Sequence, residues 1–574
     1  MLRYLKFYPL LLPLILLILG YFRPVTALNQ DLGRHLLTGK IITQSMQIPS
    51  INLFSYTYPD FPFINHHWLS EVIFYLVTSI GGYPGLFALS LLLIISAFSL
   101  VLFTAAKTAK TIPLAFLSII YLRILFERTD LRPELFSFLF LSLIITVLYR
   151  YRSTYTKLIF LLIPLQLLWV NSHIYFPIGI LVTLLFAIDI GVTHRKDLLA
   201  KQPKILLLIL ICMGLVTLIN PQGITGALYP LTVMQNYGYS IEENQTPFFL
   251  QSLGFAKPSF FYLGLAMFTL FSTLILTIKK ARLIDWFLAI LFSIIALSAV
   301  RNFPLFVFST LIPCSYALSI LCNQLSRLGK TRGTFIKFAS LIFLLILFIW
   351  QAKVITTTHP VGYGVHEDAK LSLNFIKQEK IQGPIFNNFD IGSYIESRLY
   401  PGERVFIDGR PEAYPASFIK SVYIPMQQNP DLFHKASDTY RFNAIIFSHT
   451  DQTPWGEQFI SSIIRDKNWK TVYLDSTIIV LLKNNDQNTS SIKRLGLQDT
   501  LPMTMPSDER LLRQAAHFYS AASLPEQLLP VLKRLVDISP NDCQLLGVLT
   551  SLYLQQNDPV SQIYQQKYQS SCMR

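Results

Sequence analysis

Residues 84–106 read PGLFALSLLLIISAFSLVLFTAA and are followed by Lys107. This run contains no charged side chain and, at 23 residues, it is long enough to cross the roughly 30 Å hydrocarbon core of a bilayer as one helix. Similar runs fill the first two thirds of the chain, so the sequence predicts a polytopic α-helical membrane protein with about eleven spans. We predict these spans at residues 4–22, 84–106, 112–126, 133–148, 158–170, 174–190, 203–219, 260–278, 283–300, 303–321 and 335–352.

Composition and charge agree with this class. The chain has 574 residues, of which 52% are hydrophobic and 14% are charged, and its formal net charge is +15. From residue 353 onward 22 basic residues balance 22 acidic ones, so the whole excess lies in the membrane portion. There, one set of alternate loops holds 18 basic and three acidic residues, which accounts for the full net charge. The basicity therefore indicates membrane topology and not a nucleic-acid partner.

The basic loops predict the orientation of the chain. They include Lys107, Arg152, Lys196, Lys279 and Arg332, and the positive-inside rule places them in the cytoplasm. We therefore expect a multi-pass protein of the plasma membrane with a cytoplasmic N-terminus. With an odd number of spans, the chain after residue 353 is extracytoplasmic. A cleaved signal peptide over residues 2–27 is the alternative for the first apolar run, and it leaves the later spans in the same orientation.

Polar residues gather in the loops of the opposite face. The first outer loop, residues 23–83, is long, and shorter polar stretches follow at residues 127–134, 169–173, 220–244 and 301–302. Each charge taken alone is consistent with simple capping or snorkelling at a helix end. Ionisable residues between closely spaced spans, however, usually face a bundle interior or a water-filled cavity. We expect the loops to form one site from Asp31, Arg34, His35, His66, His67, Glu71, Arg128, Arg132, His173 and Arg301.

Two helices are predicted within the first outer loop. Residues 28–45 have helical spacing, which places Asp31 and His35 on one face. Residues 68–75 read as an amphipathic helix that Trp68 anchors at the interface. His66, His67 and Glu71 could join His35 as metal ligands, but their spacing fits no dedicated metal site. Positioning of a substrate by hydrogen bonds is the preferred interpretation, and we assign no metal ligands.

The soluble end divides into two parts. Residues 353–485 predict a small extracytoplasmic α/β domain that follows the membrane domain of residues 1–352. Its expected strands are residues 384–386, 404–408, 444–447, 471–474 and 477–482, and its expected helices are residues 368–380, 416–426 and 458–465. Asp408-Gly409-Arg410 follows a predicted strand, where α/β folds often bind ligands, although a structural turn with an ion pair explains it equally well.

A linker and a helical tail occupy residues 486–574. Helices are expected at residues 508–521, 525–537, 542–555 and 559–568, as two pairs offset by about 34 residues, which resembles tetratricopeptide repeats. Such a tail favours binding of a protein partner over chemistry. Of the five cysteines, Cys212, Cys314 and Cys322 lie in predicted spans, whereas Cys543 and Cys572 could pair in an oxidising compartment.

Several short motifs carry a family resemblance. The first loop reads DLGRHLLTG at 31–39, IP at 48–49, FSYT at 54–57 and HHWLSE at 66–71; LRPE follows at 131–134, WVNSH at 169–173, NPQG at 220–223, RN at 301–302, VFIDGR at 405–410 and WKTVYLD at 469–475. Over residues 1–485 these motifs resemble a group of largely uncharacterised bacterial multispanning cell-envelope proteins. That group is similar to the GT-C class of membrane glycosyltransferases, which includes protein O-mannosyltransferases and aminoarabinose transferases.

The resemblance implies transfer of a sugar from a polyprenyl-phosphate carrier to an acceptor at the outer leaflet. It implies that Asp31, a few residues after the first span, is the general base, with His35 beside it as a second catalytic residue. Arg128, Arg132 and Arg301 could reach the lipid phosphate, and Arg34, His66, His67, Glu71 and His173 complete the expected substrate-binding set. The requirement for a divalent metal stays open.

A non-enzymatic membrane protein is the alternative. A transporter should show repeated halves and polar groups at the bilayer midplane. In this sequence the polar groups lie at the outer ends of the spans instead. A cell-envelope assembly scaffold would use the outer domain and the helical tail, and it needs no buried arrangement of an aspartate with histidines.

Overall fold

The computed structural model describes residues 5–23, 25–26, 31–194, 200–233, 237–255, 257–326, 333–358, 361–363, 365–366, 370–451, 453–475, 477–496 and 509–572. Lys196 and Arg332 of the predicted cytoplasmic face lie outside these residues, as do parts of the predicted segments at residues 2–4, 24, 27–30, 368–369 and 508. The chain forms two compact units: Met1–Val25, His35–Ser50 and Ile64–His366 make the first, and Thr26–Arg34, Ile51–Phe63 and Glu367–Arg574 make the second.

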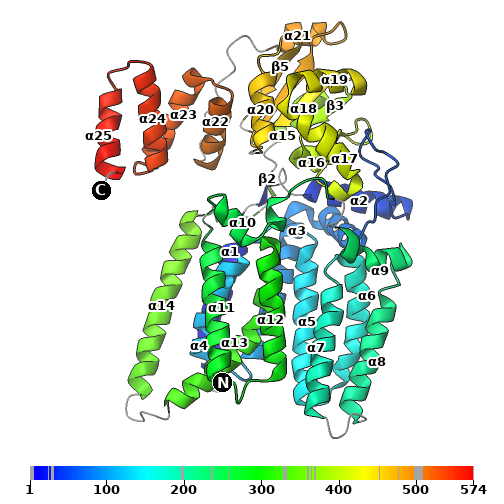
Figure 1. Ribbon diagram of the computed structural model, residues 1–574, viewed down its shortest axis with the longest axis vertical. Helices are drawn as coiled ribbons and strands as arrows, with labels where there is room; N and C mark the ends of the chain where they lie inside the picture. The colour runs from blue at the N-terminus through cyan, green and yellow to red at the C-terminus, as the bar shows by residue number, and fades with distance from the viewer. Residues whose placement is uncertain are drawn as a thin grey trace. The chain divides into compact units, whose positions relative to one another are not determined.

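Long apolar helices make up the first unit (Figure 1). Each predicted span coincides with one of them: α1 (Leu11–Tyr21, preceded by the 3-10 turn η1, Leu5–Leu10), α3 (Trp68–Ala105), α4 (Thr111–Leu125), α5 (Glu134–Ser153), α6 (Leu162–Ser172, preceded by η2, Lys157–Leu161), α7 (Pro177–Thr193), α8 (Lys201–Val216), α11 (Pro258–Leu276), α12 (Leu283–Ser298), α13 (Phe303–Ser326) and α14 (Gly333–Thr358). In the described residues, α3, α5, α11, α13 and α14 are long and apolar enough to cross a membrane, and five further apolar helices are shorter. The chain is thus a multi-pass membrane protein by its apolar helices.

Burial differs strongly between these helices. α13 contacts α3, α4, α5, α11 and α12, and its Leu305, Phe306 and Val307 side chains are fully buried. A helix that is apolar on every side and buried all round forms the centre of a bundle. α14 is different, because large side chains such as Phe338 and Ile346 are 62% and 59% exposed, as lipid-facing positions are.

Short helices lie in the loops between the long helices. α2 (Leu32–Ser45) corresponds to the predicted helix in the first loop, and α9 (Gly223–Thr232), η4 (Glu242–Asn244), α10 (Pro247–Ser252) and η5 (Val300–Asn302) lie in later loops. The helix predicted at residues 68–75 is the first part of α3. A break at Gly82, with φ of 60°, separates it from the apolar run that begins at Pro84. Gly82 adopts this conformation at little cost because it lacks a Cβ atom.

The second unit contains a mixed sheet with strand order β3-β4-β6-β5. β3 (Ile385–Asn387) runs parallel to β4 (Ala444–Ser448), while β6 (Ile478–Lys483) is antiparallel to both β4 and β5 (Trp469–Leu474). Every residue of β4 is buried, as expected for a central strand. These four strands coincide with four of the five predicted ones.

The strand predicted at residues 404–408 is wrong. This stretch forms an isolated bridge through Val405 to Ser55 and does not join the sheet. The Asn387 side chain accepts a hydrogen bond from the Phe406 amide at 2.9 Å and donates one to the Ile407 carbonyl at 2.7 Å. Backbone bonds of Val405 to Phe54 and Tyr56, together with the side-chain bonds of Asn387, therefore satisfy backbone groups that a sheet ladder would have used.

Helices cover this sheet and continue into the tail. Those near the sheet are α15 (Lys370–Gln378), α16 (Gly392–Leu399), α17 (Ala416–Phe418), α18 (Ile424–Gln428), α19 (Pro430–Tyr440), α20 (Pro454–Ile463) and α21 (Thr489–Leu495). In the tail, α22 (Glu509–Ala521) packs on α23 (Pro525–Ile538) and α24 (Cys543–Gln555) packs on α25 (Ser561–Cys572). A disulfide joins Cys543 to Cys572, so the second of these helical pairs is closed covalently.

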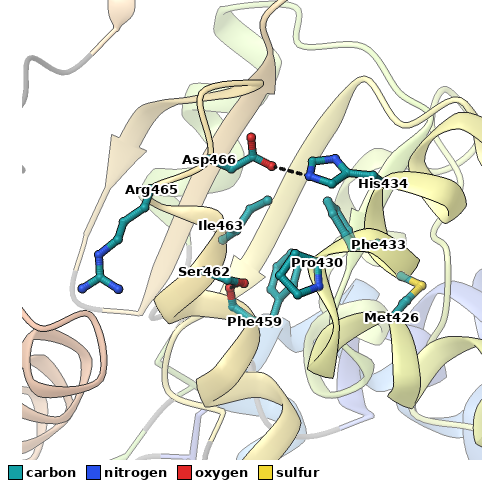
Figure 2. A pocket seen from close by; sticks show the side chains of 9 residues that line it. All are labelled: Met426, Pro430, Phe433, His434, Phe459, Ser462, Ile463, Arg465 and Asp466. Carbon is teal, nitrogen blue, oxygen red and sulfur yellow. Dashed lines mark hydrogen bonds and ion pairs between the residues drawn. The ribbon is translucent and has the colours of Figure 1, made fainter.

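A small cavity of about 240 Å³ lies between α18, α19 and α20 (Figure 2). Figure 2 shows Phe433, Phe459 and Ile463 along its wall and the side chains of His434 and Asp466 pointing toward one another, 3.2 Å apart. Ligand pockets usually hold about 300–1,000 Å³. The cavity is smaller than that and its wall is largely apolar, so we assign it no role in chemistry.

Candidate functional site

The polar cluster of the first unit contains a buried pair, the His35 imidazole and the Glu71 carboxylate. His35 Nδ1 lies 2.9 Å from Glu71 Oε1, and Asn65 Nδ2 donates to Glu71 Oε2 at 2.6 Å. The Glu71 side chain is 0% exposed, so these bonds replace its hydration. A carboxylate that accepts from the His35 ring fits the tautomer of His35 with the proton on Nδ1.

A close approach of α2 to α3 brings these two side chains together. A Cβ atom on Gly39 would lie 2.1 Å from the backbone oxygen of Glu71 and 2.9 Å from Cβ of Tyr75. Backbone and a side-chain root cannot move aside easily, so only glycine allows the two helices to pack at this distance. His35 lies one turn before Gly39 and therefore faces Glu71 on α3.

A row of histidines continues from His35. Ring centroids are 5.4 Å apart between His35 and His67, 3.8 Å between His67 and His66, and 5.3 Å between His67 and His173. Trp169 Nε1 donates to Ser137 Oγ at 2.8 Å, and Ser137 Oγ lies 2.8 Å from His173 Nδ1. Because the Trp169 proton occupies one acceptor position of Ser137, the hydroxyl can donate to His173.

His173 is electrically neutral at physiological pH. Burial lowers the pKa of His173 well below its usual range, and the positive charge of Arg301 lowers it further. Among the described residues, no group of three His, Cys, Asp or Glu side chains is arranged to hold a metal ion. Ring contacts and hydrogen bonds join the histidine row, and its role in substrate positioning stays a prediction.

Three arginines from two loops converge on Glu243. Arg132 Nη1 lies 3.0 Å from the Glu243 carboxylate, Arg128 Nη1 pairs with the same carboxylate, and Arg301 Nη1 lies 3.9 Å from it. Arg128 is held from its other side by Glu134, which accepts from its Nε at 3.0 Å. Burial alone would raise the pKa of the Glu243 carboxyl, but the three arginines hold it well below its usual range. Glu243 is therefore ionised, and it was not among the predicted site residues.

Tyr175 connects the arginines to the histidines. Its ring lies 4.7 Å from the His173 ring, and Arg301 Nε donates to its hydroxyl oxygen at 3.0 Å. The Tyr175 hydroxyl in turn donates to Asn302 Oδ1 at 2.9 Å. One continuous polar network thus runs from Glu71 to Glu243 through loops that the sequence places far apart. It contains His35, His66, His67, Glu71, Arg128, Arg132, His173 and Arg301 of the predicted site.

Asp31 and Arg34 belong to the second unit. Arg34 Nη2 lies 3.8 Å from Asp31 Oδ2, and Ser393 Oγ donates to Asp31 Oδ1 at 3.2 Å. The Asp31 side chain is 26% exposed, whereas that of Arg34 is 5% exposed. The carboxylate of Asp31 is thus accessible. Its predicted pairing with His35, which belongs to the first unit, stays a prediction.

The Asp408-Gly409-Arg410 motif forms the structural turn and ion pair that was one of its two predicted roles. Arg410 donates to Asp408 from Nε at 2.8 Å and from Nη2 at 2.6 Å, and to Asn52 Oδ1 at 2.7 Å. Tyr414 donates to Asp408 at 2.9 Å. Burial opposes ionisation of Asp408, but Arg410, together with Glu396 and Arg34, outweighs it and lowers the pKa of Asp408 to about 2. Through Arg410, the motif joins the first-loop residue Asn52 to Asp408 of the α/β domain.

Glu396, on α16, shares this buried environment. Its side chain is 1% exposed, and the negative charge of Asp408 is close by. Burial first, and then Asp408, raise the pKa of Glu396 well above its usual range. The protein therefore favours the neutral acid at this position, opposite to the behaviour of Asp408.

Comparisons with known proteins identify the fold. No protein-family model matches the chain, and no curated protein matches it. Among solved structures, the archaeal oligosaccharyltransferase AglB from Archaeoglobus fulgidus, in complex with an inhibitory peptide and a dolichol-phosphate, matches with a TM-score of 0.58 and 11% identity over 93% of this chain and 86% of that one. The A. fulgidus oligosaccharyltransferase tethered to an acceptor peptide matches with a TM-score of 0.54 and 12% identity, over 91% and 78%.

A structure of ArnT from Cupriavidus metallidurans, bound to undecaprenyl phosphate, matches at a TM-score of 0.47 and 11% identity, over 83% of this chain and 97% of that one. The two oligosaccharyltransferase matches, which span nearly the whole chain, show that this protein has a GT-C-like fold. The resemblance inferred from the sequence motifs is thereby confirmed at the level of the fold.

Proposed function

We propose that this protein is a membrane glycosyltransferase that transfers a sugar from a polyprenyl-phosphate donor to an extracytoplasmic acceptor. The observation that carries the proposal is the convergence of Arg128, Arg132 and Arg301 on one point of a GT-C-like fold. Guanidinium groups recognise phosphate through short, charge-assisted hydrogen bonds. The structural neighbours support a lipid donor, because one was solved with a dolichol-phosphate.

The arginines suit the electrostatics of such a transfer. The acceptor nucleophile forms a bond to the anomeric carbon, the bond from that carbon to the phosphate oxygen breaks, and the phosphate leaves with an added negative charge. Donors placed where charge develops stabilise the transition state more than the ground state. The proton of the acceptor passes to a base, and we propose Asp31 for this role because its carboxylate is accessible and follows the first span.

The histidine row is proposed to bind the sugar or the acceptor. His66 and His67 are partly exposed, whereas His35 and His173 are buried and held by Glu71 and Ser137. Neutral imidazoles can both donate to and accept from sugar hydroxyl groups. We also propose that the C-terminal domain is extracytoplasmic, since the Cys543–Cys572 disulfide favours an oxidising compartment.

Lipid binding by the purified full chain tests the proposal. Retention of polyprenyl phosphate in lipid nanodiscs would be measured by native mass spectrometry, with phosphatidic acid as a phosphate-bearing lipid that lacks the isoprenoid tail. We expect preferential binding of polyprenyl phosphate and an affinity that is weaker by about tenfold or more in Arg301→Gln, because a charge-assisted hydrogen bond is lost.

Arg152→Gln is the matched control. Arg152 pairs with Asp189, and its side chain is 22% exposed, as is that of Arg301. This variant should bind polyprenyl phosphate as the wild type does. Equal binding of polyprenyl phosphate and phosphatidic acid, or equal weakening by both substitutions, would contradict a donor site at the three arginines.

A further inference from the structure

Glu243 occupies the point on which the three arginines converge. Each arginine presents its Nη1 to this carboxylate, and Arg301 Nη1 also donates to Asn244 Oδ1 at 2.9 Å. Arg128 differs, because Glu134 holds its Nε and Nη2. The Nη1 groups that would contact a donor phosphate are thus the ones that contact Glu243.

Glu243 is placed by a short segment that a backbone hydrogen bond joins to a second loop. It lies in η4, and the amide of Val300 donates to the carbonyl of Gln245 at 3.1 Å. Its neighbour Glu242 points elsewhere, pairing with Lys257 at 2.8 Å with a side chain that is 53% exposed. The Glu243 side chain itself is 17% exposed, so rotation about its own bonds gives it a route to water.

We infer that the Glu243 carboxylate and the donor phosphate compete for the same three guanidinium groups, and that donor binding displaces Glu243 from them. This inference rests on the proposed function. A phosphodiester-linked sugar donor carries one negative charge, as the carboxylate does, so the exchange leaves the charge around the three arginines unchanged. The arginines never lose all their counter-charge, which would be costly for the buried Arg128 above all.

The exchange also selects for the chemistry of the ligand. A neutral polyprenol cannot replace a carboxylate at three arginines, so only an anionic lipid headgroup can release Glu243. Glu243 is therefore a specificity-determining residue for the donor, and it weakens the binding of every anion by the same competition. Once the leaving phosphate has departed with its lipid, Glu243 returns to the arginines.

Binding of polyprenyl phosphate to the full chain in nanodiscs tests this inference. In Glu243→Gln the side chain keeps its shape but loses its charge, so we expect polyprenyl phosphate to bind about tenfold more tightly than to the wild type. Glu242→Gln is the matched control, and it should bind as the wild type does. Unchanged or weaker binding by Glu243→Gln in a folded protein overturns the inference.

Hydrogen–deuterium exchange of the wild type gives a second measurement that does not depend on any variant. Addition of polyprenyl phosphate should speed exchange of backbone amides at residues 241–246, because Glu243 loses its partners, and should leave residues 385–387 of β3 unchanged. Slower exchange at residues 241–246, or no change, overturns the inference while the proposed function stands. If the wild type does not bind polyprenyl phosphate at all, the proposed function itself fails.

Discussion

Asp31 presents a carboxylate that can be neutralised without changing its shape. Asparagine keeps the size and the hydrogen-bonding capacity of aspartate but cannot accept a proton at neutral pH. If Asp31 is the general base, Asp31→Asn should lower the turnover of sugar transfer by roughly 10²-fold or more. The rate of transfer from a polyprenyl-phosphate sugar by the purified protein measures this.

The competing role for Asp31 is structural. It directly precedes α2, and asparagine caps a helix about as well as aspartate does. A purely structural Asp31 therefore predicts unchanged transfer in Asp31→Asn. Thermal unfolding of the variant is the control, because an intact melting temperature together with lost turnover separates chemistry from folding.

Glu396 and Asp408 make opposite contributions to stability as pH changes. The pKa of Glu396 is raised by burial and by Asp408, so the folded protein holds a proton there that the unfolded chain has released. The stability from Glu396 is complete below its unfolded pKa and is lost as pH rises toward its folded pKa. Asp408, with its pKa near 2, behaves in the opposite way, and its contribution is lost only in strong acid.

Glu396→Gln should therefore stabilise the protein in a pH-dependent manner. Glutamine cannot ionise, so the variant avoids the cost of deprotonating a buried acid. We expect the melting temperature of the full chain to rise more at pH 7.5 than at pH 4.5, relative to the wild type at each pH. Glu379→Gln, at a partly buried glutamate that pairs with the exposed Arg494, is the control. A stabilisation that is equal at both pH values would contradict a raised pKa at Glu396.

At the scale of elements, the tail depends on a covalent link between α24 and α25. The Cys543–Cys572 disulfide closes a segment with a sequence separation of 29, and loops of such size are typically stabilised by about 3 kcal/mol. Cys543→Ser should therefore increase the rate at which a protease cleaves within residues 543–572. Gel analysis of limited digests of the full chain would measure this rate.

Cys322→Ser, at a free cysteine of α13, is the control and should leave the digestion pattern unchanged. Added reductant should make the wild type behave as Cys543→Ser does. Equal digestion of the wild type with and without reductant would show that this disulfide does not hold the helical pair together.

The helices of the membrane domain could be predicted from the sequence alone, whereas one strand could not. Long apolar runs identify helices of a membrane protein because local composition decides them. The short stretch at residues 404–408 was mispredicted as a sheet strand because the side chain of Asn387, about twenty residues earlier, satisfies its backbone. Local β-propensity could not reveal a competitor elsewhere in the chain.

Long-range pairing set the limit for the candidate site as well. The sequence identified Arg128, Arg132 and Arg301 as one group, but it did not predict that Glu243 lies between them. Glu243 is 115 residues from Arg128, and no local pattern connects the two. The two adjacent acidic residues at 242–243, in a loop predicted to lie on the outer face, were a signal that could have suggested a partner for these arginines.

For the whole molecule, the predicted orientation can be tested by thiol labelling. In a chain without its native cysteines, Lys470→Cys on β5 should react with an impermeant reagent in intact cells. Lys107→Cys and Lys196→Cys should react only after the cells are opened, because the positive-inside rule places them in the cytoplasm. Labelling at position 196 in intact cells would contradict this topology.

Gly39 has a consequence for how related proteins could be found. The backbone of Glu71 leaves no volume for any side chain at position 39. A search for other chains that share this site should therefore require a histidine, a glycine four residues later, and a distant glutamate that follows a pair of histidines. In such a search the glycine is as diagnostic as the histidines and the glutamate.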